Sequence, residues 1–416
     1  MMNHSDSTVS TEADDLARPV KPQRRVESID LLRGLVMVVM VLDHVRDYFM
    51  DARIDATDLS TTTPALFLTR WITHFCAPTF MFLAGVSAAL SGTRRTRGEL
   101  SRYLALRGLW LIFLEQTWVS VTMFFTYPHL IFGVVLWAIG WSMIALAGLI
   151  YLPRPVIAAI GLAMIALHNL SDGFDPGGGI AGLLWSFLHV PGLKILPGGV
   201  PILFAYPLIP WIGVMAGGYA IGPLFLESPR RRRPILFAIG VASIVGFFIL
   251  RWRNIYGDPR PWEPQATFAY TAISFLNCQK YPPSLLYLLM TLGPAFMALA
   301  VLDRGMGRLG HPLRTLGQVP LFFYLLQWPL AHILAIIVAA VQGYPIGWLF
   351  QFPPFQAPPG YGRSLLPVYL FWAMTVGLLY YPSLWFSRRK KMSGSNGTDL
   401  RRKPYDAKDL QANPGI

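Results

Sequence analysis

Long apolar runs separated by short polar segments make up most of the chain from residue 28 onward. A run of about 20 apolar residues is long enough to cross a bilayer as an α-helix. These runs are also far longer than the strands of about ten residues that build membrane barrels. The pattern therefore predicts an all-α, polytopic membrane helical bundle with about ten transmembrane helices. They lie near residues 31–49, 65–91, 105–126, 130–151, 155–170, 201–226, 234–251, 283–302, 316–341 and 365–387.

The composition supports a membrane protein and argues against soluble domains. Hydrophobic residues make up 54% of the 416 residues and charged residues 14%, against roughly 25% charged in ordinary globular proteins. Two cysteines are too few for a disulfide framework, and no common nucleotide-binding or metal-binding motif occurs. We therefore expect a multi-pass protein whose main partner is the lipid bilayer, and we expect no metal.

The basic residues are concentrated in alternate connections between the predicted helices and near both termini. Connections rich in Lys and Arg stay on the cytoplasmic side of a membrane. We therefore expect both termini inside, and no nucleic-acid partner despite the net charge of +13. Residues 1–27 and 389–416 are polar, which predicts disordered cytoplasmic segments on either side of a transmembrane domain at 28–388.

The first predicted helix carries ionisable residues, each of which costs on the order of 2.5–3.5 kcal/mol inside a membrane. Asp30 and Arg33 lie three residues apart near its cytoplasmic end and can pair. Asp43, His44 and Asp47 lie near its outer end. Arg33 and His44 are eleven residues apart, which places them on one face of a helix about 16 Å apart in depth. This helix therefore presents a stripe that begins with a cation and ends with an imidazole.

The second predicted helix carries Arg70 and His74 on one face, followed by Pro78. Proline removes the hydrogen bond to the carbonyl four residues earlier, so we expect a kink at His74. His44 and His74 lie at similar predicted depths on consecutive helices, which usually neighbour each other in space. Any one of these polar residues alone is compatible with hydrogen-bonded packing, but their convergence on two helices favours a functional site.

Four further residues are weaker candidates. Glu115 lies in the middle of the third predicted helix, either as a partner of Arg70 or as part of the site. Asn277, Lys280 and Tyr281 precede two prolines at the outer mouth of the span near 283–302, where they are placed to contact a polar substrate.

Two other groups of residues point away from a site. Gly213 and Gly217 form a small-xxx-small pair, which predicts helix packing. His168 and His189 lie in or near loops and carry no functional signal in the sequence.

Several segments resemble known families. Residues 29–34 and 43–44, with the spacing from Arg33 to His44, are similar to the first helix and the Arg…His pair of the acyltransferase-3 family. Four further segments resemble bacterial proteins related to the catalytic domain of heparan-α-glucosaminide N-acetyltransferase. They are residues 67–78, 206–211, 280–285 and 316–324.

The resemblance implies a bacterial plasma (inner) membrane enzyme that transfers an acetyl group from cytoplasmic acetyl-CoA to a sugar or amino-sugar acceptor on the far side. It implies that a histidine acts as base or transient acyl carrier, and His44 and Arg33 match the acyltransferase-3 pair. Residues 50–64 contain no histidine, so the choice between His44 and His74 as the base stays open. A homodimer is compatible with this interpretation.

We assign roles to these residues as hypotheses. His44 or His74 acts as the base, because imidazole has a pKa near neutrality, and Asp43 or Asp47 orients it. Arg70 or Lys280 stabilises the oxyanion or holds an anionic acceptor. The donor is bound by Arg33 with Asp30, and the acceptor by Asp47, Asn277, Lys280, Tyr281 and Glu115.

The alternative is a small-molecule transporter or flippase, because polar residues on kinked helices also line transport paths. The sequence shows no paired inverted repeat, which disfavours that class.

Overall fold

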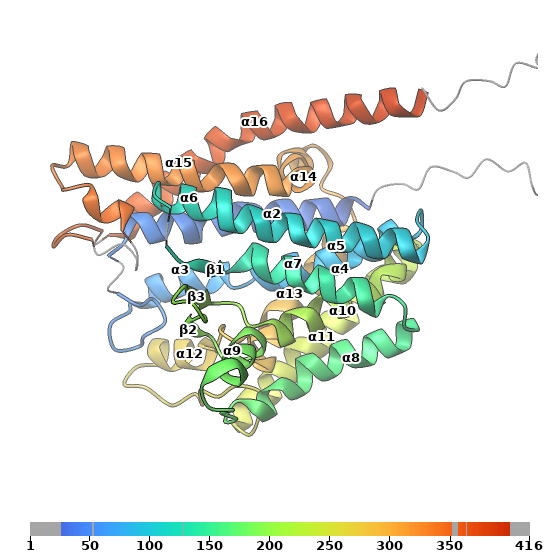
Figure 1. The fold of residues 1–416 in the computed structure, drawn as a ribbon, viewed down its shortest axis with the longest axis horizontal. Coiled ribbons are helices and arrows are strands. Elements are labelled where there is room, and N and C mark those ends of the chain that lie inside the picture. The colour runs from blue at the N-terminus through green and yellow to red at the C-terminus, as the bar shows by residue number, and fades with distance from the viewer. Residues whose placement is uncertain (1–25, 52–53, 128, 352–356, 363, 400–416) are drawn as a thin grey trace, which may run out of the picture.

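The computed structural model describes residues 26–51, 54–127, 129–351, 357–362 and 364–399, and it is mostly helical. Most of the helices run along one common direction (Figure 1). The first helices are α2 (Glu27–Phe49), α3 (Pro64–Thr73), α4 (Cys76–Gly92), α5 (Arg97–Leu114), α6 (Ser120–Phe124), α7 (Val135–Leu149), α8 (Arg154–Leu167) and α9 (Gly179–Leu188). The remaining ones are α10 (Leu208–Ile221), α11 (Pro229–Arg253), α12 (Phe268–Leu276), α13 (Leu285–Leu302), α14 (His311–Gln318), α15 (Pro320–Val341) and α16 (Leu365–Asp399).

Seven helices of the described chain are long and apolar enough to cross a membrane. They are Pro64–Gly92, Arg154–Ser171, Leu208–Leu226, Pro229–Arg253, Leu285–Leu302, Pro320–Val341 and Leu365–Met392. The other three predicted spans are also largely helical, but α2 and α5 carry several charged residues and α7 has only 15 residues. The structure thus confirms a mainly helical protein with several apolar spans, and the count of ten stays a prediction.

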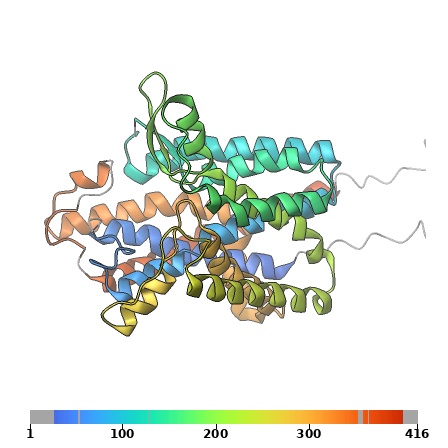
Figure 2. The ribbon, with the colours of Figure 1, turned by 90° about the horizontal axis from the view of Figure 1, so that it is seen from below.

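A small three-stranded sheet corrects the expectation that the chain is all-α. Its strands are β1 (Ile131–Gly133), β2 (Gly192–Ile195) and β3 (Pro201–Phe204). β3 lies in the middle, parallel to β1 and antiparallel to β2. β1 and β3 occupy the starts of two predicted spans. Pro201 and Pro207 favour extended backbone at the residues before them, so the apolar run near 201–226 becomes helical only at Leu208. Figure 2 shows the region of β2 and α9 projecting from the side of the helical bundle.

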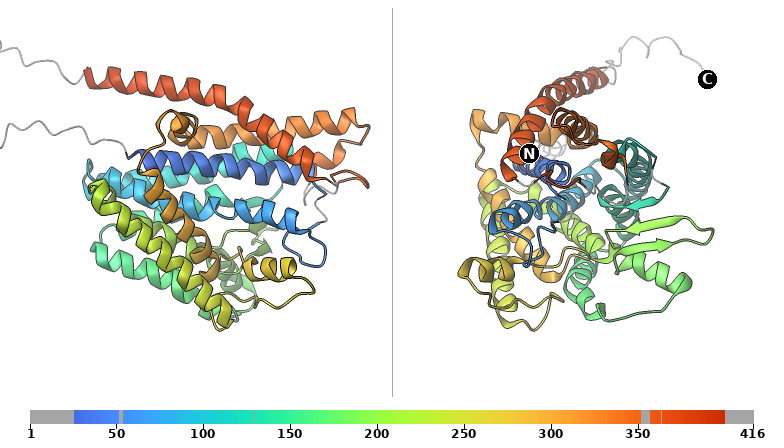
Figure 3. Two further views of the ribbon diagram at one scale, coloured as in Figure 1. Left: turned by 180° about the vertical axis from the view of Figure 1, so that it is seen from behind. Right: turned by 90° about the vertical axis from the view of Figure 1, so that its left-hand side faces the viewer.

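Helix α2 runs through the interior of the bundle. It contacts α3, α4, α13, α14, α15 and α16, and Figure 3 shows it between α15 and α16 on one side and α4 on the other. Its contact with α14 is a backbone approach, because a Cβ on Gly34 would lie 1.9 Å from the Leu313 carbonyl oxygen. A helix packed against six others in this way can hold polar side chains out of contact with lipid.

Helices α2 and α16 place the two ends of the described chain at the same end of the bundle (Figure 1). This arrangement agrees with the prediction that both termini lie on one side of the membrane. Helix α16 continues to Asp399, into the segment 389–416 that was expected to be a disordered tail. The rest of that segment, and residues 1–25 of the predicted N-terminal segment, lie outside the described residues.

Candidate active site

The end of α2 that is predicted to face the cytoplasm, called the inner end and opposed to the outer end, carries the predicted Asp30–Arg33 pair. Arg33 Nη1 lies 3.6 Å from Asp30 Oδ1, which confirms the pairing inferred from their spacing. Arg33 also donates hydrogen bonds to Ser87 Oγ of α4, at 2.9 Å, and to the Gly317 carbonyl of α14, at 3.3 Å. Arg33 is therefore fixed between three helices, with its charge balanced by a buried carboxylate.

The outer end of α2 carries a network of ionic pairs. Asp43 forms a close ion pair with Arg70 of α3 and a second, at 3.2 Å, with Arg46. Arg46 also pairs with Asp47 at 2.7 Å. The carboxylates that were expected to orient a histidine thus bind arginines instead, and one of these pairs joins α2 to α3.

His44 faces α15 and is held by aromatic rings. Its imidazole stacks on Trp328 with the ring centroids 4.0 Å apart, and Tyr324 lies edge-on at 6.3 Å. Its buried Nδ1 atom has no hydrogen-bond partner in the described part of the chain. Stacking therefore sets the plane of the ring, and the side chain of Gln327 on the same helix α15 is its polar neighbour.

His74 lies at the break between α3 and α4, where the sequence predicts a kink. Helix α3 ends at Thr73 and α4 begins at Cys76, so the interruption stands one turn before Pro78. The His74 carbonyl that loses its helical partner accepts a hydrogen bond from Tyr287 Oη of α13 at 2.8 Å. The His74 ring lies 5.4 Å from the Tyr287 ring and is 2% exposed. His74 is thus enclosed at the junction of α3, α4 and α13.

The segment before α13 brings Lys280 and Tyr281 to the same end as the Asp43–Arg70 pair. The Lys280 ammonium lies 5.1 Å from the centroid of the Tyr281 ring, which lies 5.3 Å from the ring of Tyr206. Burial raises the pKa of the Tyr281 hydroxyl, but the Lys280 and Arg70 cations and the hydrogen bond with Tyr206 outweigh it. The pKa of Tyr281 therefore lies below its usual value, which shows how positive its surroundings are.

Asn277 and Glu115 make structural contacts. Asn277 Nδ2 donates to the Thr57 carbonyl at 2.8 Å, which fastens the loop after α2. Glu115 is fully buried, and its Oε2 atom accepts the backbone N–H groups of Leu136 and Trp137 at 2.6 and 3.1 Å. A carboxylate is favourable at a helix N-terminus, so Glu115 caps α7. It is not hydrogen-bonded to Arg70, which was one of the two alternatives from the sequence.

A central cavity of about 280 Å³ lies between α2, α4, α5, α7 and α15. Arg33, Arg107 and Lys390 line it at the inner end, and Tyr324, the edge-on neighbour of His44, lines it farther out. Apolar side chains form most of the wall between them, among them Met37 and Met40, Phe80, Ala84, Leu104 and Leu111. The stripe from Arg33 through Met37 and Met40 thus follows the cavity toward His44.

A second, basic cavity of about 930 Å³ opens beside the first at the inner end. The two cavities share Arg33, Ser87 and Ser91. The basic cavity is lined by four further arginines: Arg94 and Arg95 between α4 and α5, Arg232 in the first turn of α11, and Arg304 after α13. The two spaces therefore meet at Arg33.

Residues 25–234, half of the chain, match the family described as heparan-alpha-glucosaminide N-acetyltransferase, catalytic. The chain belongs to this family. It is a multi-pass membrane protein of a transmembrane acetyltransferase family. No curated protein matches the chain.

In this member of the N-acetyltransferase family, the matched residues include α2, α3 and α4, and with them Arg33, His44, Arg70 and His74. The 280–285 and 316–324 segments, which also resemble the family, lie beyond the match. The sequence did not single out Tyr324 and Trp328, which contact His44, or Ser87, Ser91 and Arg107 in the cavity wall. The basic residues among the cavity groups were counted as a topology signal, and no spacing in the sequence separates them from the other arginines between the predicted helices.

Proposed function

We propose that this protein transfers an acetyl group from acetyl-CoA, bound at the end of the bundle where α2 begins, to a sugar or amino sugar at the other end. The observation that carries the proposal is the central cavity, which runs from Arg33 to the tyrosine beside His44. Membership of a transmembrane acetyltransferase family supports the same chemistry.

The two cavities fit the two parts of the donor. Coenzyme A carries phosphates at its nucleotide end, and arginines bind phosphates through charge-assisted, often bidentate hydrogen bonds. Arg94, Arg95 and Arg304 of the basic cavity offer such a site, whereas Arg232 is already paired with Asp303. The narrower, mostly apolar central cavity suits the extended arm that ends in the thioester. Arg33 lies where the two meet, and its bonds to Asp30 and Ser87 keep it in place.

His44 is the better candidate for the base. In the proposed step its unprotonated nitrogen removes a proton from the amine or hydroxyl of the acceptor, whose lone pair attacks the thioester carbonyl. The tetrahedral intermediate expels coenzyme A as a thiolate, which receives the proton from the imidazolium. His44 touches Tyr324 of the cavity wall, whereas the ring neighbour of His74, Tyr287, does not line the cavity.

Lys280 is the cation best placed to stabilise negative charge at the outer end, on the intermediate or on an anionic acceptor. The charge of Arg70 is already balanced by the close pair with Asp43. Lys280 instead faces the Tyr281 ring.

The proposal is tested with the purified full chain, acetyl-CoA and a panel of amino sugars, by measuring release of the free thiol. Replacing a general base removes a factor of about 10²–10⁴, so His44→Ala should lose turnover to that extent, and His74→Ala should lose less. His129→Ala, at an exposed position, is the matched control.

Full turnover by His44→Ala would refute the assignment of the base. A protein that transports an amino sugar without consuming the thioester would be a transporter or flippase, and the enzymatic proposal would fail.

A further inference from the structure

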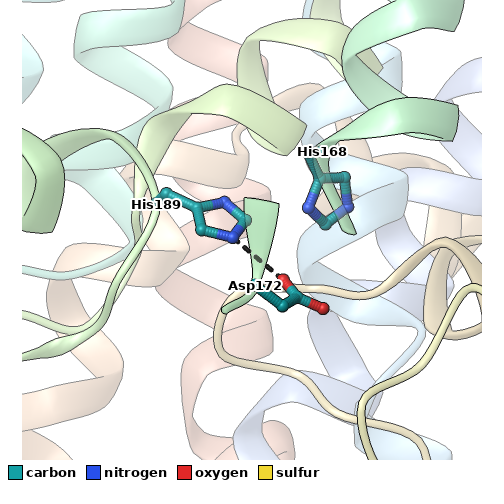
Figure 4. Close-up of side chains that lie close together, drawn as sticks. All are labelled: His168, Asp172 and His189. Carbon is teal, nitrogen blue, oxygen red and sulfur yellow. Dashed lines mark hydrogen bonds and ion pairs between the residues drawn. The ribbon is translucent and has the colours of Figure 1, made fainter. Parts of the chain in front are cut away.

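Three residues that the sequence did not connect lie together at the outer end of α8 (Figure 4). His168 and Asp172 flank the short turn after α8, and His189 follows α9. His189 Nε2 lies 2.9 Å from Asp172 Oδ1. One ligand atom from each of the three side chains lies within 4.8 Å of the others. The fold thus gathers two imidazoles and one carboxylate from separate segments.

The two histidines are buried and incompletely hydrogen-bonded. His168 is 5% exposed and His189 is 1% exposed. The ring of His168 has the Pro283 carbonyl as a hydrogen-bond acceptor for one of its two nitrogens, and Nδ1 of His189 forms no hydrogen bond within the described residues. Buried polar atoms are nearly always satisfied. The His168 nitrogen that does not face Pro283 therefore points to a partner other than the protein.

We propose that His168, Asp172 and His189 bind a divalent transition-metal ion, with Zn²⁺ as the best fit. Two imidazoles with one carboxylate is a ligand set that Zn²⁺ takes, whereas Mg²⁺ and Ca²⁺ prefer oxygen ligands throughout. Ligand atoms about 2.1 Å from a tetrahedral ion are about 3.4 Å apart. The side chains therefore need to close in slightly around the ion, which replaces the His189–Asp172 hydrogen bond with two metal bonds.

The surroundings supply the supporting contacts that metal ligands usually have. Asn169 Nδ2 donates to Asp172 Oδ2 at 2.9 Å, which orients the carboxylate. The nearby Pro283 carbonyl can accept the N–H of His168 that does not face the ion. Asn169 also accepts, through Oδ1, the backbone N–H of Leu285 at the start of α13, at 2.9 Å. The ion would therefore tie the loop around α9 to the segment that carries Lys280 and Tyr281.

This inference is independent of acetyl transfer, and its test reads the metal directly. The full chain is purified through a tag without histidine, stripped with a chelator and titrated with Zn²⁺ by calorimetry. Binding of one Zn²⁺ per chain is expected. Co²⁺ bound in its place should give a visible absorption band, and Zn²⁺ should raise the thermal unfolding temperature of the protein.

Two variants and one control locate the ion. Asp172→Asn keeps the size of the side chain, and His168→Gln keeps a polar group. Each should weaken Zn²⁺ binding by more than about 100-fold, because loss of a mere outer-shell partner already removes 10–100-fold. His129→Ala, exposed and outside the cluster, should bind as the unmodified protein does.

Asp172→Asn must unfold at the temperature of the stripped parent, which shows that loss of binding is not loss of fold. The proposal is overturned if the unmodified protein binds no Zn²⁺, which would leave a buried hydrogen-bonded His–Asp pair. It is equally overturned if both variants keep the affinity and the Co²⁺ spectrum, which would place the ion elsewhere.

Discussion

Asp43 and Arg70 form an ion pair whose side chains are 14% and 15% exposed. The pair connects α2 to α3 at the level of the proposed reaction centre. Removing one member of a buried pair leaves an uncompensated charge, which is usually far more harmful than removing both. The pair therefore positions the outer half of α2, and with it His44, whether or not either residue touches substrate.

Asp43→Asn is expected to destabilise the protein by about 3–5 kcal/mol, because it leaves the Arg70 charge less compensated. The double variant Asp43→Asn/Arg70→Gln should recover part of that loss. The coupling between Asp43 and Arg70 is measured by a double-mutant cycle, which compares the free energies of unfolding of the parent, the two single variants and the double variant in mixed detergents. Asp47→Asn is the control: the Asp47 side chain is 38% exposed, so its loss should stay within about 1 kcal/mol. Strictly additive effects of Asp43 and Arg70 would contradict the coupling.

Residue spacing predicted the contacts that lie within one helix. The Asp30–Arg33 pair and the stripe from Arg33 to His44 follow from helical geometry alone, and α2 is a continuous helix over both. Contacts between different helices were harder to predict from the sequence. Glu115 caps α7, 21 residues further on, and nothing local in the sequence distinguishes this partner from Arg70.

At the scale of elements, glycines decide how closely some helices approach. A Cβ on Gly218 of α10 would lie 2.2 Å from the Phe82 carbonyl oxygen of α4, and a Cβ on Gly85 would lie 2.0 Å from the Met215 carbonyl oxygen. The backbones of α4 and α10 are thus in direct contact, and any residue larger than glycine at these positions would prevent that contact. Gly213 of the predicted small-residue pair packs in a similar way against Gly161 of α8.

Gly218→Ala should therefore destabilise the protein by more than about 1 kcal/mol, because α4 and α10 must separate to admit the methyl group. Gly217→Ala is a matched control on the same helix, since a Cβ there meets no atom within 4 Å. It should be neutral or stabilising by up to about 1 kcal/mol, because alanine favours the helix over glycine. The unfolding temperatures of the two variants are compared with that of the parent. Equal effects would show that the close contact between α4 and α10 does not determine stability.

The pattern of apolar runs located the helices well and the sheet not at all. Runs of about 20 residues give a strong signal, so the described helices fall close to the predicted spans. β1 and β3 are only three and four residues long and lie within the same apolar runs. Their pairing partner β2 is contributed by a loop, which hydropathy alone cannot detect.

For the whole molecule, the proposed donor and acceptor regions lie at opposite ends of the bundle. Both cavities adjoin the beginning of α2, and Lys280 lies near the Asp43–Arg70 pair at the other end of that helix. The distribution of basic residues in the sequence predicted which end of the bundle faces the cytoplasm. The cavities themselves could not be predicted, because their walls combine side chains of many helices that lie far apart in the chain.

This separation predicts a sided reaction in membrane vesicles. Inside-out vesicles should consume acetyl-CoA added to the medium, since the coenzyme does not cross the bilayer and its proposed site then faces outward. Right-side-out vesicles should consume it only after permeabilisation. Thiol release measures both, and detergent-solubilised protein gives the full rate as a control. Equal rates in the two kinds of intact vesicle would contradict the arrangement.

Because Arg33 and His44 belong to one uninterrupted helix, the gap between them is set by helical rise and not by how neighbouring helices pack. At 1.5 Å per residue this gap is about 16 Å. Movements of α5 or α15 would widen or narrow the passage but leave its length the same. In the proposed mechanism, the helix therefore fixes the length of donor that fits. A donor whose phosphates bind near Arg33 places its thioester carbon near His44, and a longer or shorter donor would place a different atom there.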